Sequence, residues 1–346
     1  MSLRVASLGA GYFAQFQLEA WTRIGGAELC GIADLDPERA AAVASAYGTK
    51  SFPNLDALLS VTDADILDIA VPPPGHADAI RTALSAGVKA IICQKPFCGS
   101  LAEAEEVTAL AAKSEIPLIV HENFRWQPWY RVMAEAIVDG RIGPPQNLTF
   151  RLRTGDGQGG RAYLDRQPYF QKMSRFLIHE TGVHWIDVFR YLMGSDPVDV
   201  YADIRRLNPA IAGEDAGHIV FGFENGARAL FDGNRLLDHA AKNTRLTLGE
   251  ALVEGPNGAL SLNGYGEVAF RAFGGYETEV LLPAKDWPGF GGDCVFALQS
   301  HVVDGLANGR NFENSASDYL AVRRVEEAAY QSAEVGRKIT LGLDTR

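Results

Sequence analysis

Short apolar runs alternate with amphipathic stretches through the first 122 residues. The apolar runs are rich in β-branched side chains and are expected to be strands at residues 3–8, 27–33, 66–71, 88–93 and 117–121. The stretches between them predict helices at residues 14–24, 37–47, 77–86 and 101–113. This alternation predicts an α/β fold, a doubly wound parallel sheet with helices on both faces.

The pattern changes after residue 122, where apolar and polar residues alternate with a period of two. This period and the turns Asn225-Gly226 and Asn257-Gly258 predict a mostly antiparallel sheet. Strands are expected at residues 146–153, 198–206, 218–223, 227–231, 245–248, 251–254, 259–262, 267–273 and 278–282, with helices at 128–139, 176–194, 294–308 and 315–336. The 346 residues favour two domains, an α/β domain at 1–122 and an α+β domain at 123–346.

A glycine motif follows the first predicted strand. Gly9, Gly11 and Ala14 match G-x-G-x-x-G/A between a strand and a helix, the setting that this fingerprint requires. Gly9 allows a tight turn, and Gly11 lets the backbone approach a pyrophosphate at the helix N-terminus. The motif predicts a dinucleotide site.

An acidic residue ends the second predicted strand. Asp34 lies at the distance from the glycine motif where a carboxylate accepts hydrogen bonds from the adenosine ribose and repels a 2′-phosphate. Leu35 occupies the next position, where NADP-binding chains often carry arginine. NAD is therefore expected in preference to NADP.

Two further strand ends carry candidate chemistry. The run Ile91–Pro96 places Lys95 where a buried parallel strand ends, and Pro96 biases Lys95 towards extended backbone. Ligands of open α/β sheets bind at this carboxyl edge. The Pro72–Gly75 loop is expected at the same edge, with His76 either touching the cofactor or serving only as a cap or packed ring.

One helix in the second half stands out. Glu180 and His184 are four residues apart and share a face, and Asp187 lies further along. A carboxylate one turn from an imidazole can hold one tautomer and tune a general base. A structural His–Glu pair is the alternative. His179 and His184 are at i and i+5, one residue too far for H-E-x-x-H, so zinc is not expected.

Composition narrows the class of protein. A net charge of −11 argues against nucleic acid as a partner, and no apolar run is long enough to span a membrane. The first residues lack the pattern of a secretory signal, and the four cysteines show no C-x-x-C spacing. A cytoplasmic protein is expected.

With these motifs placed, the chain resembles the glucose–fructose oxidoreductase, inositol dehydrogenase and MocA family over its whole length. The resemblance rests on Gly9-Ala10-Gly11 with Asp34, Pro72-Pro73 with His76, Gln94-Lys95-Pro96, Asn123 to Pro128, and Gly182 to Asp187. It implies a Rossmann domain, a second domain whose open sheet forms dimers or tetramers, and NAD(P)-dependent hydride transfer to or from a sugar or cyclitol.

The resemblance also implies roles for single residues. Lys95 matches the family's lysine, His184 matches its catalytic histidine, and Glu180 stands where aspartate is common. Gln94 replaces the usual glutamate. The residues expected to bind cofactor are Gly9, Gly11, Tyr12, Phe13, Asp34, Leu35, Val71, Pro72, Pro73, His76, Gln94, Lys95 and Asn123. Those expected to bind substrate are Lys95, Asn123, Arg125, Trp126, Arg161, Tyr163, Glu180 and His184, with Trp287 as a further candidate.

The expected reaction is dehydrogenation of a CH–OH group. His184 removes the hydroxyl proton, Lys95 stabilises the developing alkoxide, and Glu180 orients the imidazole or contacts substrate hydroxyls. Two alternatives remain: a sensor that binds NAD and sugar without turnover, and a glycosidase in which NAD transiently oxidises the sugar.

Overall fold

The computed structural model describes residues 2–342, which form two compact units. Unit 1 takes Met1–Asn123 and Asp293–Ala321, and unit 2 takes Phe124–Gly292 and Val322–Arg346. The expected boundary at residue 122 lies beside the observed one. The expectation that residues 123–346 form one domain is wrong, because the chain returns to unit 1 for one segment.

Unit 1 is built on a six-stranded sheet with the order β3-β2-β1-β4-β5-β6, and all its pairs are parallel. The strands are β1 Leu3–Leu8, β2 Ala27–Ala33, β3 Ser51–Phe52, β4 Ile66–Ile69, β5 Ala90–Gln94 and β6 Leu118–His121. The helices are α1 Ala14–Arg23, α2 Pro37–Ala46, α3 Leu55–Thr62, α4 His76–Ala86, α5 Leu101–Lys113 and α8 Cys294–Asn308. The predicted parallel α/β sheet is confirmed.

Side-chain caps explain where several of these helices begin. Asp36 accepts from the backbone of α2, and Ser100 does the same for α5. Asn54 caps α3 by accepting from Ala57 N at 2.9 Å. The apolar pattern did not predict α3 or the two-residue strand β3 before it, because neither is long enough to show a clear period.

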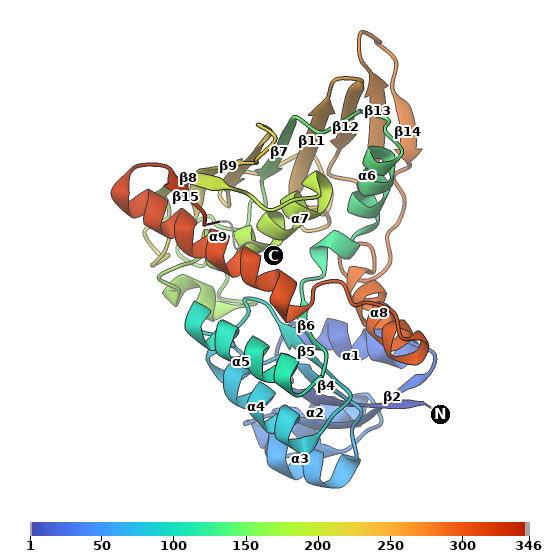
Figure 1. Ribbon diagram of the computed structural model, residues 1–346. Helices are drawn as coiled ribbons and strands as arrows, with labels where there is room; N and C mark the ends of the chain where they lie inside the picture. The colour runs from blue at the N-terminus through green and yellow to red at the C-terminus, as the bar shows by residue number, and fades with distance from the viewer. Residues whose placement is uncertain (1, 343–346) are drawn as a thin grey trace. The chain divides into compact units, whose positions relative to one another are not determined.

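The strand order reverses between β1 and β4. The connections from β1 run towards β3 and those from β4 run towards β6, so their helices cover opposite faces of the sheet. In Figure 1, α1 lies beside α8, while α3, α4 and α5 pack in series. Such a reversal opens a crevice at the carboxyl ends of the two strands.

A buried carboxylate joins the elements behind this sheet. Asp68, in the middle of β4, is fully buried and accepts from Gln17 at 2.8 Å, Trp21 at 2.7 Å and Gln299 at 3.1 Å. Gln17 and Trp21 belong to α1 and Gln299 to α8. The bond to Gln299 shows why Asp293–Ala321 belongs to unit 1.

Unit 2 is built on a nine-stranded sheet with the order β14-β13-β12-β11-β7-β10-β9-β8-β15. The strands are β7 Asn147–Leu152, β8 Asp199–Arg205, β9 Ala216–Gly222, β10 Arg228–Asn234, β11 Gly249–Gly255, β12 Gly258–Leu262, β13 Val268–Ala272, β14 Glu279–Leu282 and β15 Ile339–Thr340. Within residues 2–342, β7 and β10 are the one parallel pair in this sheet. The predicted mostly antiparallel sheet is confirmed.

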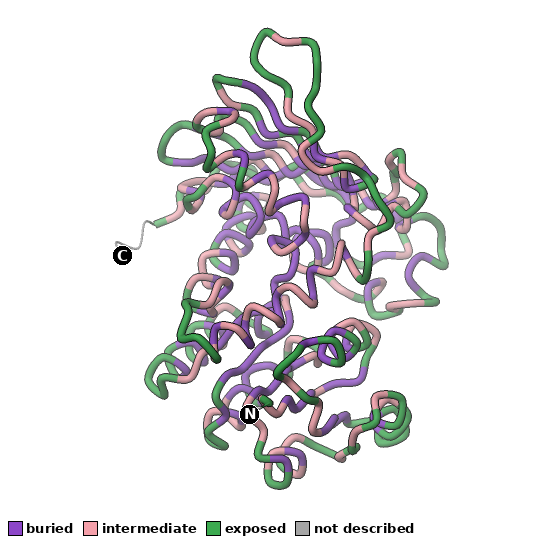
Figure 2. The backbone as a smooth tube through the Cα atoms, turned by 90° about the vertical axis from the view of Figure 1, so that its right-hand side faces the viewer, coloured by how far each residue is buried: buried purple, intermediate pink, exposed green. Residues whose placement is uncertain are grey.

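One face of this sheet carries the core. Burial alternates along β7 and β10, as the period of two predicts. Figure 2 colours the whole chain by burial, and short buried and exposed stretches follow one another along its extended segments. Trp185 stacks on Phe150 with ring centroids 4.1 Å apart and lies 5.5 Å from Phe231. The helices of this unit are α6 Pro128–Val138, α7 Val183–Met193 and most of α9 Ala316–Val335.

Two predictions in unit 2 need correction. Residues 245–248 are not a strand, because the Asn243 side chain accepts from Arg245 N at 3.1 Å and its carbonyl accepts from Leu246 N, which closes a turn. The single helix expected at 176–194 is a π-helix, η4 Leu177–Gly182, followed by α7. Gly194 ends α7 with φ 68°, as predicted.

Asp68 predicts an unusual pH dependence of stability. Burial raises the pKa of Asp68 to about 7, although its three hydrogen bonds oppose the shift. Between about pH 4 and pH 7 the folded state holds a proton that the unfolded state has lost, so this group makes the free energy of unfolding fall as pH rises. Asp68→Asn should remove that loss, because the Gln17 and Gln299 amide oxygens have no bonding partner among residues 2–342 and can accept from the new amide.

Urea unfolding at pH 4.5, 6 and 8 measures this effect. The Asp68→Asn variant should gain stability over the wild type progressively with pH, on a scale of about 1.4 kcal/mol per pKa unit. Asp65→Asn is the matched control, because Lys89 and a backbone bond lower the pKa of Asp65 overall although burial opposes them. This carboxylate is ionised in both the folded and the unfolded state across this pH range, so the stability difference between Asp65→Asn and the wild type should not change with pH. Parallel stability curves for wild type and Asp68→Asn would contradict the prediction.

Candidate functional site

The glycine loop after β1 is shaped for close backbone approach. Gly9 has φ 106°, and a Cβ atom there would lie 2.8 Å from the Ala70 carbonyl carbon, so the loops after β1 and β4 touch. A Cβ on Gly11 would meet nothing within 4 Å. No side chain in the described part of the chain caps the start of α1. Open backbone before an uncapped helix N-terminus is a site for a phosphate group.

The aromatic residues of this loop pack along its sides. Tyr12 and Phe13 are half-buried. The Tyr12 ring lies 5.8 Å from Phe16, and the Phe13 ring lies 6.2 Å from His121. They therefore line the loop and leave Gly11 open.

Asp34 holds the glycine loop against the end of β2. Its Oδ2 accepts from Ala10 N at 2.8 Å, and its Oδ1 accepts from Asp36 N at 2.9 Å and from Arg39 Nη2 at 2.8 Å. Burial opposes ionisation, but these bonds lower the pKa of Asp34 below its usual value. A negative charge therefore faces the loop, and Leu35 beside it is 93% exposed.

Sequence reasoning missed Arg39, which pairs with Asp34. It lies in the first turn of α2, and its side chain remains about half exposed. The one signal available in the sequence was the position of Arg39, one turn after the Asp36 cap. Arg39 puts a positive charge next to the Asp34 carboxylate, which is expected to accept hydrogen bonds from the adenosine ribose.

His76 is a packed residue that joins two loops. Its ring is fully buried, with Nδ1 accepting from Cys98 N at 3.2 Å and Nε2 lying 2.8 Å from Val71 O. Because the backbone amide can only donate, Nε2 carries the proton and donates to the carbonyl. Of the two roles considered for His76, the structure favours the packed ring. Val71, Pro72 and Pro73 remain the residues of this loop that are expected to contact the cofactor.

The ends of β5 and β6 carry two buried polar atoms without a partner among residues 2–342. Gln94 Oε1 accepts from Lys95 N at 2.8 Å, but Gln94 Nε2 bonds to no protein atom. Asn123 Nδ2 donates to Cys294 Sγ at 2.9 Å, but Asn123 Oδ1 has no donor. Lys95 is half-buried and precedes a cis peptide bond to Pro96. One spare donor and one spare acceptor suit a carboxamide group.

In unit 2, His184 is held by ring stacking. It is buried, and its imidazole lies flat on Phe124 with centroids 3.6 Å apart and an interplanar angle of 5°. The Trp185 ring meets it edge-on at 6.3 Å. Stacking fixes the plane of the imidazole, which is what a positioned base requires.

The π-helix before α7 is anchored from outside. Glu214 Oε1 accepts from Phe176 N and from Ile178 N, both at 3.1 Å, and from the Tyr330 hydroxyl at 2.6 Å. His179 turns to Glu326, with Nδ1 2.6 Å from Oε1. Turns of this kind occur often at functional sites. Sequence reasoning missed Glu214, since nothing in its local pattern marks it.

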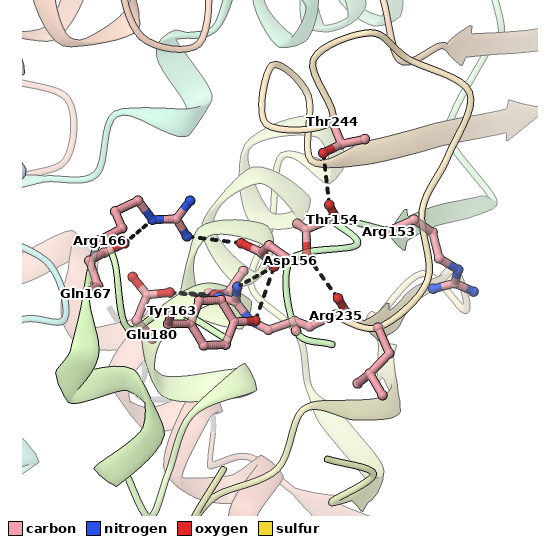
Figure 3. Close-up of polar contacts among 12 residues, drawn as sticks. Arg153, Thr154, Asp156, Tyr163, Arg166, Gln167, Glu180, Arg235 and Thr244 are labelled. Carbon is pink, nitrogen blue, oxygen red and sulfur yellow. Dashed lines mark hydrogen bonds and ion pairs between the residues drawn. The ribbon is translucent and has the colours of Figure 1, made fainter. Parts of the chain in front are cut away.

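Glu180 belongs to a network of buried polar groups, drawn in Figure 3. Its Oε2 accepts from Thr181 Oγ1 at 2.6 Å and from Arg235 Nη2 at 3.0 Å. Arg235 was also missed. Its position directly after β10 becomes informative only once β7 and β10 are known to be parallel.

Asp187 and Arg125 form a buried ion pair. Arg125 Nε donates to Asp187 Oδ2 at 2.7 Å, and Arg190 Nη1 lies 3.6 Å from Oδ1. Arg125 was expected to bind substrate, and the structure places its guanidinium on this fully buried carboxylate. Asp187 accordingly anchors η2 Phe124–Trp126 to α7.

Four other residues that were expected to bind substrate differ in their burial and in their bonding partners. Tyr163 is buried and donates from its hydroxyl to Asp156 Oδ1 at 3.1 Å. Arg161 is exposed and pairs with Asp165. The Arg131 guanidinium covers Trp126 at 3.8 Å, and Trp287 Nε1 donates to Tyr265 O at 3.0 Å. Among residues 2–342 no cluster of His, Cys, Asp and Glu has the arrangement of a metal site.

Family models match most of the chain. Residues 3–122 match an oxidoreductase family with an NAD-binding Rossmann fold, and residues 130–258 match the GFO/IDH/MocA C-terminal domain. The features of unit 1, an open Gly11 and the buried amides of Gln94 and Asn123, fit that cofactor. The fold and site therefore define an NAD-binding oxidoreductase.

Similar proteins agree. D-apiose dehydrogenase of Paraburkholderia graminis is 34% identical over 97% of this chain and 89% of its own, and inositol 2-dehydrogenase of Rhizobium meliloti is 26% identical over 99% and 100%. An oxidoreductase structure from Agrobacterium radiobacter, in complex with NAD+, L-tartaric acid and magnesium, superposes with a TM-score of 0.90 at 30% identity, covering 98% of each chain. This chain belongs to the Gfo/Idh/MocA family of oxidoreductases, as its sequence motifs indicated.

The two loop glycines predict different outcomes for one added methyl group. Gly11→Ala should fold normally, since its Cβ meets open space, but should weaken NAD binding about tenfold or more by blocking backbone approach. Gly9→Ala should instead lower the melting temperature, because its φ and the Ala70 backbone exclude a Cβ. Titration calorimetry with NAD and thermal melts separate the two effects. Equal NAD affinity in Gly11→Ala and wild type would contradict this assignment.

Proposed function

We propose that this protein is a dehydrogenase of a sugar or cyclitol that uses NAD in preference to NADP. The relatives named above act on D-apiose and on inositol. The observation that carries the proposal is the presence of two residues in a chain of this family. Lys95 lies directly after β5, and His184 lies on α7 and stacks on Phe124. A sensor would need neither an amine nor a positioned imidazole.

In the proposed mechanism, bound NAD supplies the acceptor for the hydride that leaves the carbinol carbon. Its carboxamide would be held by Gln94 and Asn123, and its pyrophosphate by the backbone at Gly11. The His184 imidazole takes the hydroxyl proton. The Lys95 ammonium donates a hydrogen bond to the same oxygen and stabilises its developing negative charge. Glu180 accepts from a neighbouring substrate hydroxyl.

The preference for NAD rests on Asp34. Its ionised carboxylate would accept from ribose hydroxyls and repel a 2′-phosphate. Arg39 opposes that preference, since its guanidinium is 2.8 Å from Asp34 and half exposed. We infer that the balance between this pair sets the cofactor preference.

A charge substitution tests this balance. Asp34→Ser should shift the ratio of NADP to NAD affinity towards NADP by roughly tenfold or more, because the repelling carboxylate is lost and Arg39 remains. Asp34→Ser/Arg39→Ala should lose that gain. Calorimetric titration of each variant with both cofactors measures the ratio. The same ratio of affinities in the single and double variants would show that Arg39 does not contribute to the cofactor preference.

A polyol panel tests the proposed function itself. Wild-type protein with NAD should oxidise D-apiose, myo-inositol or a related sugar, read as NADH absorbance. Silence on the whole panel despite NAD binding would favour a sensor. Release of an aglycone without net NADH would favour an NAD-assisted glycosidase.

Two variants test the proposed roles on the best substrate. Lys95→Ala should lower turnover about 10²–10³-fold and His184→Ala about 10²–10⁴-fold, while NAD still binds. Lys89→Ala is the control, since that lysine is exposed and pairs with Asp65. Unchanged turnover in either site variant would remove the role assigned to that residue.

We also propose a homodimer or homotetramer formed through the sheet of unit 2. Its support is the family resemblance and the exposed apolar side chains on the sheet, Tyr201 on β8 and Leu252 on β11 among them.

A cytoplasmic location is proposed from the free thiols of all four cysteines. None of the helices described in residues 2–342 combines the length and hydropathy of a membrane span.

A further inference from the structure

The parallel pair in unit 2 brings two loops to one edge of the sheet. Arg235 directly follows β10, and Asp156 lies in the loop after β7. Gly157 N donates to Arg235 O at 3.0 Å, and a Cβ on Gly157 would lie 3.0 Å from that same oxygen. Figure 3 shows the two loops meeting beside Glu180. The loop after β7 is thus tied closely to Arg235.

Arg235 is a buried cation surrounded by aromatic rings. Its guanidinium carbon lies 4.5 Å from the centroid of Phe176, 5.5 Å from Tyr163 and 5.7 Å from Phe170. A guanidinium stays charged even when buried, and such a charge is stable only with good partners. The partners here are Glu180 at 3.0 Å and Asp156 at 3.6 Å.

Thr181 completes the hold on Glu180. Arg235 Nη2 donates to Thr181 Oγ1, and Thr181 Oγ1 in turn donates to Glu180 Oε2 at 2.6 Å. One carboxylate oxygen therefore receives bonds from two directions. The Glu180 side chain is 17% exposed and that of Arg235 only 5%, so the cation lies behind the carboxylate.

The loop after β7 supports Arg235 from its other side. Asp156 accepts from Thr154 Oγ1 at 2.6 Å, from the Tyr163 hydroxyl at 3.1 Å and from Arg166 Nη2 at 3.0 Å. These three donors hold the Asp156 carboxylate in place where it faces Arg235. The network is a chain of fixed contacts from the loop to Glu180.

We propose that Arg235 and Thr181 are positioning residues that hold the Glu180 carboxylate for a hydroxyl of the sugar or cyclitol. This inference rests on the proposed function. Glutamate has one more rotatable bond than the aspartate common at this position, so an unsupported carboxylate would lose more entropy on binding substrate. The clamp, defined as Arg235 with Thr181, removes that freedom before substrate arrives.

Thr181→Val tests the clamp with little change of volume. It should raise KM for myo-inositol or D-apiose roughly tenfold, because a hydrogen bond to a charged group is lost, and should change kcat less. Thr181→Ser should return KM to within about twofold of the wild type by restoring the hydroxyl. Arg235→Lys should raise KM in the same direction, since an ammonium cannot reproduce the guanidinium fork.

Thr247→Val is the matched control. Thr247 is also buried in unit 2, and its hydroxyl donates to Gly249 O at 2.7 Å, apart from the clamp. It should keep the wild-type KM. All variants should keep the wild-type affinity for NAD. An unchanged KM in Thr181→Val, or an equal rise in Thr247→Val, would overturn the proposal.

A second readout separates failure of the clamp from failure of the proposed function. If the wild type oxidises neither sugar, myo-inositol and D-apiose are titrated calorimetrically into NADH-loaded wild type and Thr181→Val. Weaker binding in the variant, restored in Thr181→Ser, supports the clamp. Equal binding in both proteins, or no binding by the wild type, contradicts it.

Discussion

Parallel pairing of strands is the constraint on which both parts of the candidate site depend. Parallel neighbours end at the same edge of a sheet, so loops that are far apart in the sequence meet there. In unit 1, β1 and β4 bring Gly9 against the backbone of Ala70. In unit 2, β7 and β10 bring Asp156 and Arg235 together behind Glu180. Each unit concentrates its polar chemistry where parallel strands end.

The two units stabilise their polar groups differently. Asp34 is held by backbone amides and by one half-exposed arginine, an arrangement that ligand hydroxyls can join. Arg235 is buried, and two carboxylates and three rings surround it. A buried cation of this kind is costly to rearrange. Unit 1 therefore offers adaptable bonding, whereas unit 2 holds a rigid carboxylate, which we propose binds substrate.

How far the sequence could predict this molecule depended on how local the signal was. The glycine motif, Asp34 and the lysine at the end of β5 each follow from a strand and the turn after it, and the fold class followed from the periods of the apolar pattern. The return of Asp293–Ala321 to unit 1 could not be predicted from the sequence. It depends on the hydrogen bond from Gln299 of α8 to Asp68, and Asp68 lies inside an apolar strand far away in the chain. Arg125 and Tyr163 look like substrate residues in sequence, but the sequence does not show that Arg125 pairs with the distant Asp187 or that Tyr163 donates to Asp156 within its own loop.

The central claim is that Lys95 and His184 act on one hydroxyl of a substrate bound with NAD. The most direct measurement is a crystal structure of the protein with NADH and the sugar that it binds best. The account predicts one sugar oxygen within hydrogen-bond distance of both the Lys95 amine and the His184 imidazole, with the carbon bearing it facing the nicotinamide ring. A sugar that meets only one of these side chains, or lies away from the nicotinamide, would contradict the account.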